Sequence, residues 1–172
     1  MNRIIVFLIF SMLVLSGKAQ QSAVDRIFEK YSGKEGYTSV FISKYMFSMF
    51  SEVDPDNKEF TDLVNRLNSI RILAIDETTG STGVNFYTEI MKELSVKEYK
   101  ELMVIKEKDQ DMKFLVRDIN GRIVELLLII GGSKDNALIC IQGENINLKN
   151  IAKLSSAMKI EGLENLEKIN SK

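Results

Sequence analysis

The pair Asn120-Gly121 and the apolar run that follows it limit the fold of this chain more than any other feature. Both residues tolerate the positive φ that a type I′ turn requires, so the pair predicts a hairpin of two antiparallel strands. Residues 123–130 are nearly continuous in apolar side chains, with Glu125 as their one charge. Such a run is typical of a central strand that is covered at least in part on both faces. We therefore expect a meander of strands at residues 113–118, 122–130 and 137–142.

Helical and strand patterns alternate along the rest of the chain. Ser22 and Asp25 resemble a capping box at the start of a helix over residues 23–32. Asp54 before Pro55 is typical of a helix start, because the carboxylate caps free N–H groups and proline fits the first turn. Asn147 is expected to cap a helix near the C-terminus. We also expect helices at residues 44–50, around residues 86–94 and at residues 163–169, and strands at residues 38–43, 70–76 and 99–106.

These patterns together predict an α+β fold. The expected architecture is a mixed, mainly antiparallel sheet of about five strands, with a meander in its second half, covered by amphipathic helices. If residues 99–106 are extended, the order strand, helix, strand over residues 70–106 also admits one parallel crossover unit.

The N-terminal segment, residues 1–19, resembles a secretory signal peptide. A short basic start with Arg3 precedes an apolar run at residues 4–15, and Gly17 and Ala19 are the small side chains that signal peptidase prefers. A retained membrane anchor is the alternative, but this run is short against the roughly 20 residues that a bilayer core requires. We expect cleavage near Ala19, no stable membrane insertion afterwards, and a periplasmic or secreted product.

Residues 20–172 are expected to form a single α+β domain, because 153 residues suffice to bury one sizeable core. They carry 21 basic and 24 acidic side chains, and this balance does not indicate a nucleic-acid partner. The only cysteine, Cys140, lies in the apolar run of residues 137–141 and is expected to be a buried small hydrophobic residue. An exposed thiol that forms intermolecular bridges is the alternative.

The absence of histidine excludes several chemistries. No Ser-His-Asp or Cys-His arrangement and no histidine-ligated zinc site is possible, and one cysteine is too few for a cysteine-rich zinc or iron–sulfur site. The glycine-rich stretch at residues 131–134 superficially resembles a phosphate-binding loop. The Walker spacing requires a further glycine upstream and a helix afterwards, whereas a strand is expected here, so we interpret the stretch as a hairpin turn.

Acidic residues provide the remaining candidates for a site. Residues 54–59 and 107–111 are rich in oxygen ligands, but neither segment has the turn glycine of a calcium loop. We interpret the first as a helix start and the second as a solvated turn. Glu125 is a candidate for a carboxylate-dependent enzyme if it points into a cavity, although we expect it to face solvent or to pair with a lysine or arginine. The sequence thus predicts no catalytic, cofactor-binding or metal-binding residue.

Several stretches of the chain match one known family. They are Ala19-Gln20-Gln21, Phe28 with Tyr31 in the first helix, and residues 40–43, 72–75 and 142–148 before residues 151–154. On these hydrophobic-pattern matches the chain resembles the exported Bacteroidetes proteins grouped as the domain of unknown function 4252 family. The resemblance implies an envelope α+β domain, and the expected proximity of its genes to those for extracytoplasmic sigma factors implies envelope regulation. It implies no active-site residue.

Three classes of function remain open. We expect a non-enzymatic interaction or regulatory module of the envelope, because a secreted domain without a polar constellation works most economically by surface complementarity. It would bind an envelope protein or envelope component through a sheet face or through residues 46–50, where Met and Phe gather. A buried short helix is the other interpretation of that segment. The alternatives in function are a small-molecule or lipid binder with an apolar pocket and a carboxylate-dependent enzyme.

Overall fold

The computed structural model of the chain describes residues 22–53, 57–75, 84–94, 98–132 and 136–151. The described helices are α2 (Ala23–Tyr31), α3 (Lys44–Val53), α4 (Lys58–Arg66) and α5 (Phe86–Glu93). The strands are β1 (Tyr37–Ser43), β2 (Leu67–Ile75), β3 (Lys100–Lys106), β4 (Gln110–Ile119), β5 (Arg122–Gly132) and β6 (Asn136–Gly143). The predicted signal at residues 1–19 and the predicted helix at residues 163–169 lie outside the described residues.

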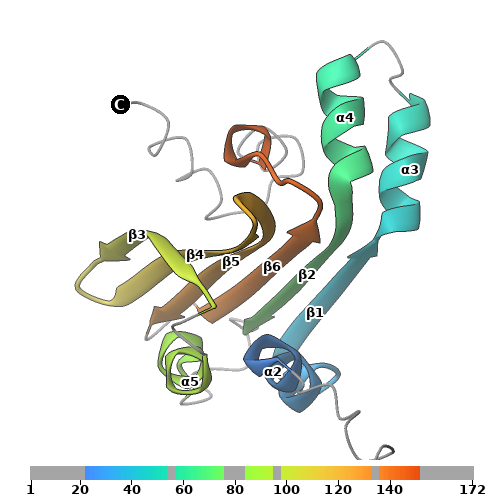
Figure 1. Cartoon of the computed structure of the whole chain (residues 1–172). Coiled ribbons are helices and arrows are strands. Elements are labelled where there is room, and N and C mark those ends of the chain that lie inside the picture. Colours follow the sequence, from blue (N-terminus) through green and yellow to red (C-terminus); the bar gives the residue numbers. More distant parts are fainter. Residues whose placement is uncertain (1–21, 54–56, 76–83, 95–97, 133–135, 152–172) are drawn as a thin grey trace, which may run out of the picture.

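The strands form a single six-stranded sheet in the order β1-β2-β6-β5-β4-β3, and every pair of neighbours is antiparallel (Figure 1). The predicted α+β class and the meander in the second half are confirmed, with six strands where about five were expected. β2 and β3 run in the same direction, as the predicted crossover requires. They are not neighbours, however, because β6, β5 and β4 lie between them.

The β4–β5 hairpin turns at the predicted residues. Asn120 has φ 54° and Gly121 has φ 77°, the left-handed conformation that a type I′ turn demands at both central positions. The register of this hairpin shifts between Arg117 and Asp118, so one extra residue of β5 is left without a partner.

Apolar side chains cover both faces of the sheet. On one face, Leu127 and Ile129 of β5 are buried with residues of α2 and α5, which lie side by side (Figure 1). On the other face, Leu126 and Leu128 are buried with residues of α3 and α4 and with Ile146 and Ile151. The prediction that β5 is covered on both faces is therefore confirmed.

Helix α2 begins where the sequence predicts it. The Ser22 hydroxyl accepts a hydrogen bond from the Asp25 backbone N–H at 3.0 Å, which satisfies one of the free donors of the first turn. The side chains recurring at helical spacing all face the sheet and are buried: Ala23, Val24, Ile27, Phe28 and Tyr31.

The predicted start of α4 is wrong. The helix begins at Lys58, and its cap is Asn57, whose side chain accepts from the Phe60 N–H at 3.1 Å. Asp54 and Pro55 lie outside the described residues. Leu67, the residue after α4, is the first residue of β2 and is fully buried in the same core cluster as Leu63.

The described chain ends in the first turn of the predicted C-terminal helix. Asn147 caps this turn, since its side-chain oxygen accepts from the Lys149 N–H at 3.0 Å. Among the described residues, no helix has the length and apolar character needed to cross a bilayer.

Candidate functional site

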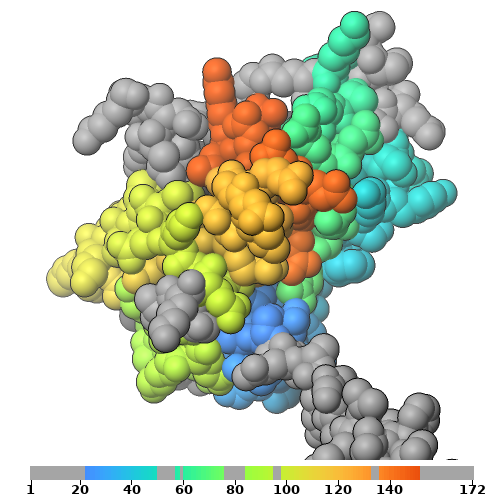
Figure 2. Space-filling model, in the orientation of Figure 1, coloured from blue at the N-terminus to red at the C-terminus, as the bar shows by residue number. Residues whose placement is uncertain are grey.

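Large exposed hydrophobic side chains gather on β1 and α3. Phe41 of β1 is 68% exposed and Tyr45 of α3 is 75% exposed. β1 leads directly into α3 without a loop, and the two elements lie together along one rim of the molecule, with Val40 and Phe41 on opposite faces of the sheet (Figures 1 and 2). We call it the β1–α3 surface and define it by five residues: Val40, Phe41, Tyr45, Met46 and Met49.

Residues 46–50 had two interpretations, a hydrophobic binding segment and a buried short helix, and the structure supports each for different residues. Phe47 is buried against α4 and the sheet, as expected for a core helix. Met46 and Met49 are exposed, so the interpretation as a wholly buried helix is wrong for them. α3 thus has one apolar face in the core and presents a second to the outside.

β1 is an edge strand of the sheet. It pairs with β2 through seven consecutive residue pairs without a register shift, and its other side has no partner among the described strands. Its sequence, YTSVFIS, contains no charge and no proline. The strand is therefore a regular, uncharged edge, and its outward side pairs with no other strand in the part of the chain that the structure describes.

A hollow of about 260 Å³ lies between α2 and β1. Its lining includes Phe28 and Ser32 on the helix side, Ser39 and Phe41 on the strand, and Arg71. The Arg71 guanidinium carbon lies 4.7 Å from the centre of the Phe28 ring, and its Nη1 lies 2.7 Å from an Asp25 carboxylate oxygen. The Arg71 Nε is buried and has no hydrogen-bond partner among the described residues.

Asp25 remains ionised beside Arg71. Burial by itself would raise the pKa of the Asp25 carboxyl group. Hydrogen bonds from Ser22 and Arg71 and the positive charge of Arg71 outweigh that effect and lower the pKa. One wall of the hollow therefore holds a fixed ion pair.

A polar row, with Cys140 and Glu125 buried at its centre, continues from Arg71 across the sheet beneath α2 and α5. The Arg71 guanidinium lies 3.8 Å from the Cys140 sulfur, which lies 3.6 Å from Glu125 Oε1. Tyr99 donates to the same oxygen at 2.9 Å, and Arg117 donates to Glu125 Oε2 at 2.7 and 3.1 Å. The predicted pairing of Glu125 with a basic residue is confirmed.

Glu125 does not line either of the described hollows and is only 3% exposed. Both of its oxygens accept hydrogen bonds within the polar row. Burial, followed by the charge of Glu125, raises the pKa of Cys140 to about 12 and also raises the pKa of Tyr99. These groups therefore hold protons at neutral pH and act as hydrogen-bond donors to Glu125. Cys140 is buried, as predicted.

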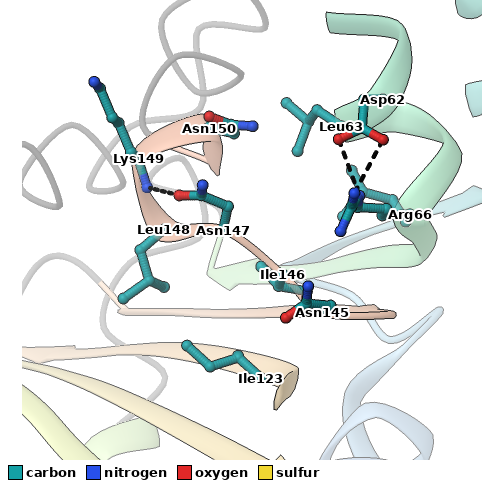
Figure 3. Close-up of a pocket in the computed structure, with 11 residues that line it drawn as sticks. Asp62, Leu63, Arg66, Ile123, Asn145, Ile146, Asn147, Leu148, Lys149 and Asn150 are labelled. Carbon is teal, nitrogen blue, oxygen red and sulfur yellow. Dashed lines mark hydrogen bonds and ion pairs between the residues drawn. The ribbon is translucent and has the colours of Figure 1, made fainter. Parts of the chain in front are cut away.

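A second hollow of about 460 Å³ lies between α4 and residues 145–150 (Figure 3). Its polar groups are partly engaged with one another. Asp62 and Arg66 form an ion pair at 3.0 Å, and Asn147 accepts from the Lys149 N–H. Asn150 of this lining is next to Ile151, the last described residue of the chain. We therefore assign this hollow no ligand.

The other predicted segments have structural roles. Gly131 and Gly132 of the glycine-rich stretch are the last residues of β5, and Gly131 pairs with Asn136 of β6, while residues 133–134 lie outside the described residues. Residues 107–109 connect β3 to β4. Within the described ranges, His, Cys, Asp and Glu side chains form no cluster of three or more that could hold a metal ion.

The fold and the β1–α3 surface together define a class of protein: a fully antiparallel α+β sheet domain with described helices against both faces and an uncharged edge strand, β1, that exposes hydrophobic side chains. The chain belongs to the family described as Domain of unknown function (DUF4252), whose profile matches residues 31–154 and so spans all six strands. The resemblance inferred from the sequence is confirmed. Searches of the curated proteins and of the solved structures return no match.

Proposed function

We propose that this protein is a non-enzymatic interaction module that is exported to the bacterial envelope and binds a protein partner there through the β1–α3 surface. One observation carries the proposal. Of the six large hydrophobic side chains that the described residues expose, five lie within residues 40–49, and the sixth is Ile119. Clustered apolar exposure of this kind is typical of interaction sites, whereas single exposed hydrophobic residues are ordinary.

The chemistry of α3 suits a protein partner. Met46 and Met49 are unbranched and polarizable, so they adapt to differently shaped apolar surfaces. Tyr45 adds a large ring with a polar hydroxyl group, a combination enriched where protein interfaces form. Phe47, on the opposite side of the helix, fixes α3 to the core and so presents these three side chains from a rigid support.

The structure gives less support to a small-molecule or lipid binder. The hollow between α4 and residues 145–150, about 460 Å³, lies within the usual range of ligand pockets, roughly 300–1,000 Å³, but more than half of its lining side chains are polar or charged. The hollow between α2 and β1 holds about 260 Å³, below that range. Its lining includes Glu29, Ser32 and the paired Arg71, which do not suit a lipid chain.

Site-specific photo-crosslinking in intact cells tests the proposal. A photoreactive residue placed at Met49 is compared with one placed at Ile119, because both side chains are 50% exposed. We expect a defined protein to be crosslinked from Met49 and not from Ile119. The double variant Tyr45→Ser, Met49→Ser should reduce that product about tenfold or more. The same products from both positions, or a lipid or glycan adduct at Met49, would contradict the proposal.

Export is tested separately. The N-terminal pattern at residues 1–19 supports it. N-terminal sequencing of the protein recovered from its own cells should begin at Gln20, and fractionation should place it outside the cytoplasm. An intact leader in the cytoplasmic fraction contradicts the envelope assignment and leaves the partner surface as a separate question.

A further inference from the structure

The two edges of the sheet differ in their protection against pairing with another chain. Edge strand β3 carries Lys100, Glu101 and Lys106, and its register shifts between Glu101 and Met103. Charges and irregularities of this kind are how native sheets discourage edge-to-edge association. Edge strand β1 has neither, since it is uncharged and regular over its whole length.

We propose that β1 is a self-association edge: a second copy of this chain pairs with it antiparallel about a two-fold axis at Val40, joining the two sheets. An isologous contact of this type requires a strand that is complementary to itself. The inference goes beyond the proposed function, since it assigns Val40 and Phe41 to a second copy and leaves the α3 residues of the β1–α3 surface to the envelope partner.

The sequence of β1 meets the requirement for self-complementarity. Val40 is the middle residue of the strand, so only a register centred on it pairs all seven residues. In this register Val40 faces Val40, Ser39 faces Phe41, Thr38 faces Ile42 and Tyr37 faces Ser43. Each of the three largest side chains thus meets a smaller one, and like faces of the two sheets stay on the same side.

The hollow between α2 and β1 also fits a second copy. Phe41 of the second copy faces Ser39, which lines the hollow between α2 and β1. The Phe41 ring of each copy, which is exposed in the single chain, therefore lies beside the hollow next to α2 of the other copy.

Sedimentation equilibrium of the purified protein, expressed from the full chain, tests the pairing. We expect a monomer–dimer equilibrium in the micromolar range. Val40→Lys places two like charges opposite each other on the axis and should raise the dimer dissociation constant about tenfold or more. Ile119→Lys, at an exposed hydrophobic residue on the β4–β5 turn, is the matched control and should leave it unchanged. Phe41→Ser serves as a second β1 variant if circular dichroism shows that Val40→Lys unfolds the chain.

A cysteine crosslink tests the register. Residues facing each other on the axis bring their Cβ atoms within roughly 5 Å, close to disulfide geometry. Val40→Cys should therefore form a disulfide-linked dimer under mild oxidation, whereas Met103→Cys, at the middle of β3, should not. Cys140 does not interfere, because it is buried. A protein that stays monomeric up to about 100 μM, or equal crosslinking from both positions, overturns the proposal.

Discussion

At the scale of single residues, the pairing of Arg117 with Glu125 depends on one irregularity in the backbone. Counting outward from Asn120-Gly121, a regular hairpin would place Val116 opposite Glu125. The register shift between Arg117 and Asp118 instead places Arg117 opposite Glu125, on the same face of the sheet. The sequence predicted a basic partner for Glu125 but did not identify Arg117, because the bulge that brings the two residues opposite each other depends on strand geometry rather than on a residue pattern.

Arg117→Met should destabilise the fold by about 3 kcal/mol or more, because it leaves the buried carboxylate of Glu125 without its cation. Urea unfolding at neutral pH measures the loss. Arg66→Met removes an exposed i,i+4 pair with Asp62 and should cost less than about 1 kcal/mol. Equal losses in the two variants would show that the polar row is solvated.

At the scale of helices and strands, the local signals in the sequence were reliable where a short segment decides the structure. The capping box at Ser22, the turn at Asn120-Gly121 and the cap at Asn147 all lie where predicted. The start of α4 was misplaced because Asn57 competes with Asp54 as a cap only three residues away. α5 shows what such signals miss, because the buried Asn136, fifty residues along the chain, accepts from the Phe86 N–H at 3.1 Å.

Asn136→Ala tests this distant cap. The substitution removes the acceptor for the Phe86 N–H and the donor to the Gly132 carbonyl, which is 2.9 Å away. We expect a loss of about 2–3 kcal/mol in the free energy of unfolding, since a buried N–H is left unsatisfied. Asn85→Ala, at the local cap of the same helix, should cost only about 1 kcal/mol. A loss at Asn136 no larger than that at Asn85 contradicts this account.

At the scale of the whole molecule, the class of fold was predictable and the strand order was not. Alternating helical and strand patterns indicate α+β, and the near-continuous apolar run of β5 indicates a central strand. The placement of β2 beside β6 depends on pairing between residues such as Ile70 and Ile141, which are far apart in the sequence. No local sequence pattern specifies that contact. For the same reason the sequence did not predict that β1 is an edge strand.

Burial of β5 on both faces is a testable property of the whole fold. Leu127→Ala and Leu128→Ala remove fully buried side chains that point to opposite faces. Each should lower the free energy of unfolding by about 2–5 kcal/mol, because a cavity forms in either core. Leu102→Ala, on edge strand β3 and only partly buried, should cost less in the same urea titration. A small loss of stability in Leu128→Ala would contradict this account, because it would mean that the face covered by α3 and α4 is loosely packed.

The unequal edges also limit how far copies of this chain can add to one another. In the proposed symmetric pair both β1 strands are used, and the edge strands left over among the described residues are the two β3 strands with their lysines and glutamate. A third copy would have to join a charged, irregular rim. Pairing through β1 would therefore stop at two copies instead of growing into an open-ended fibril.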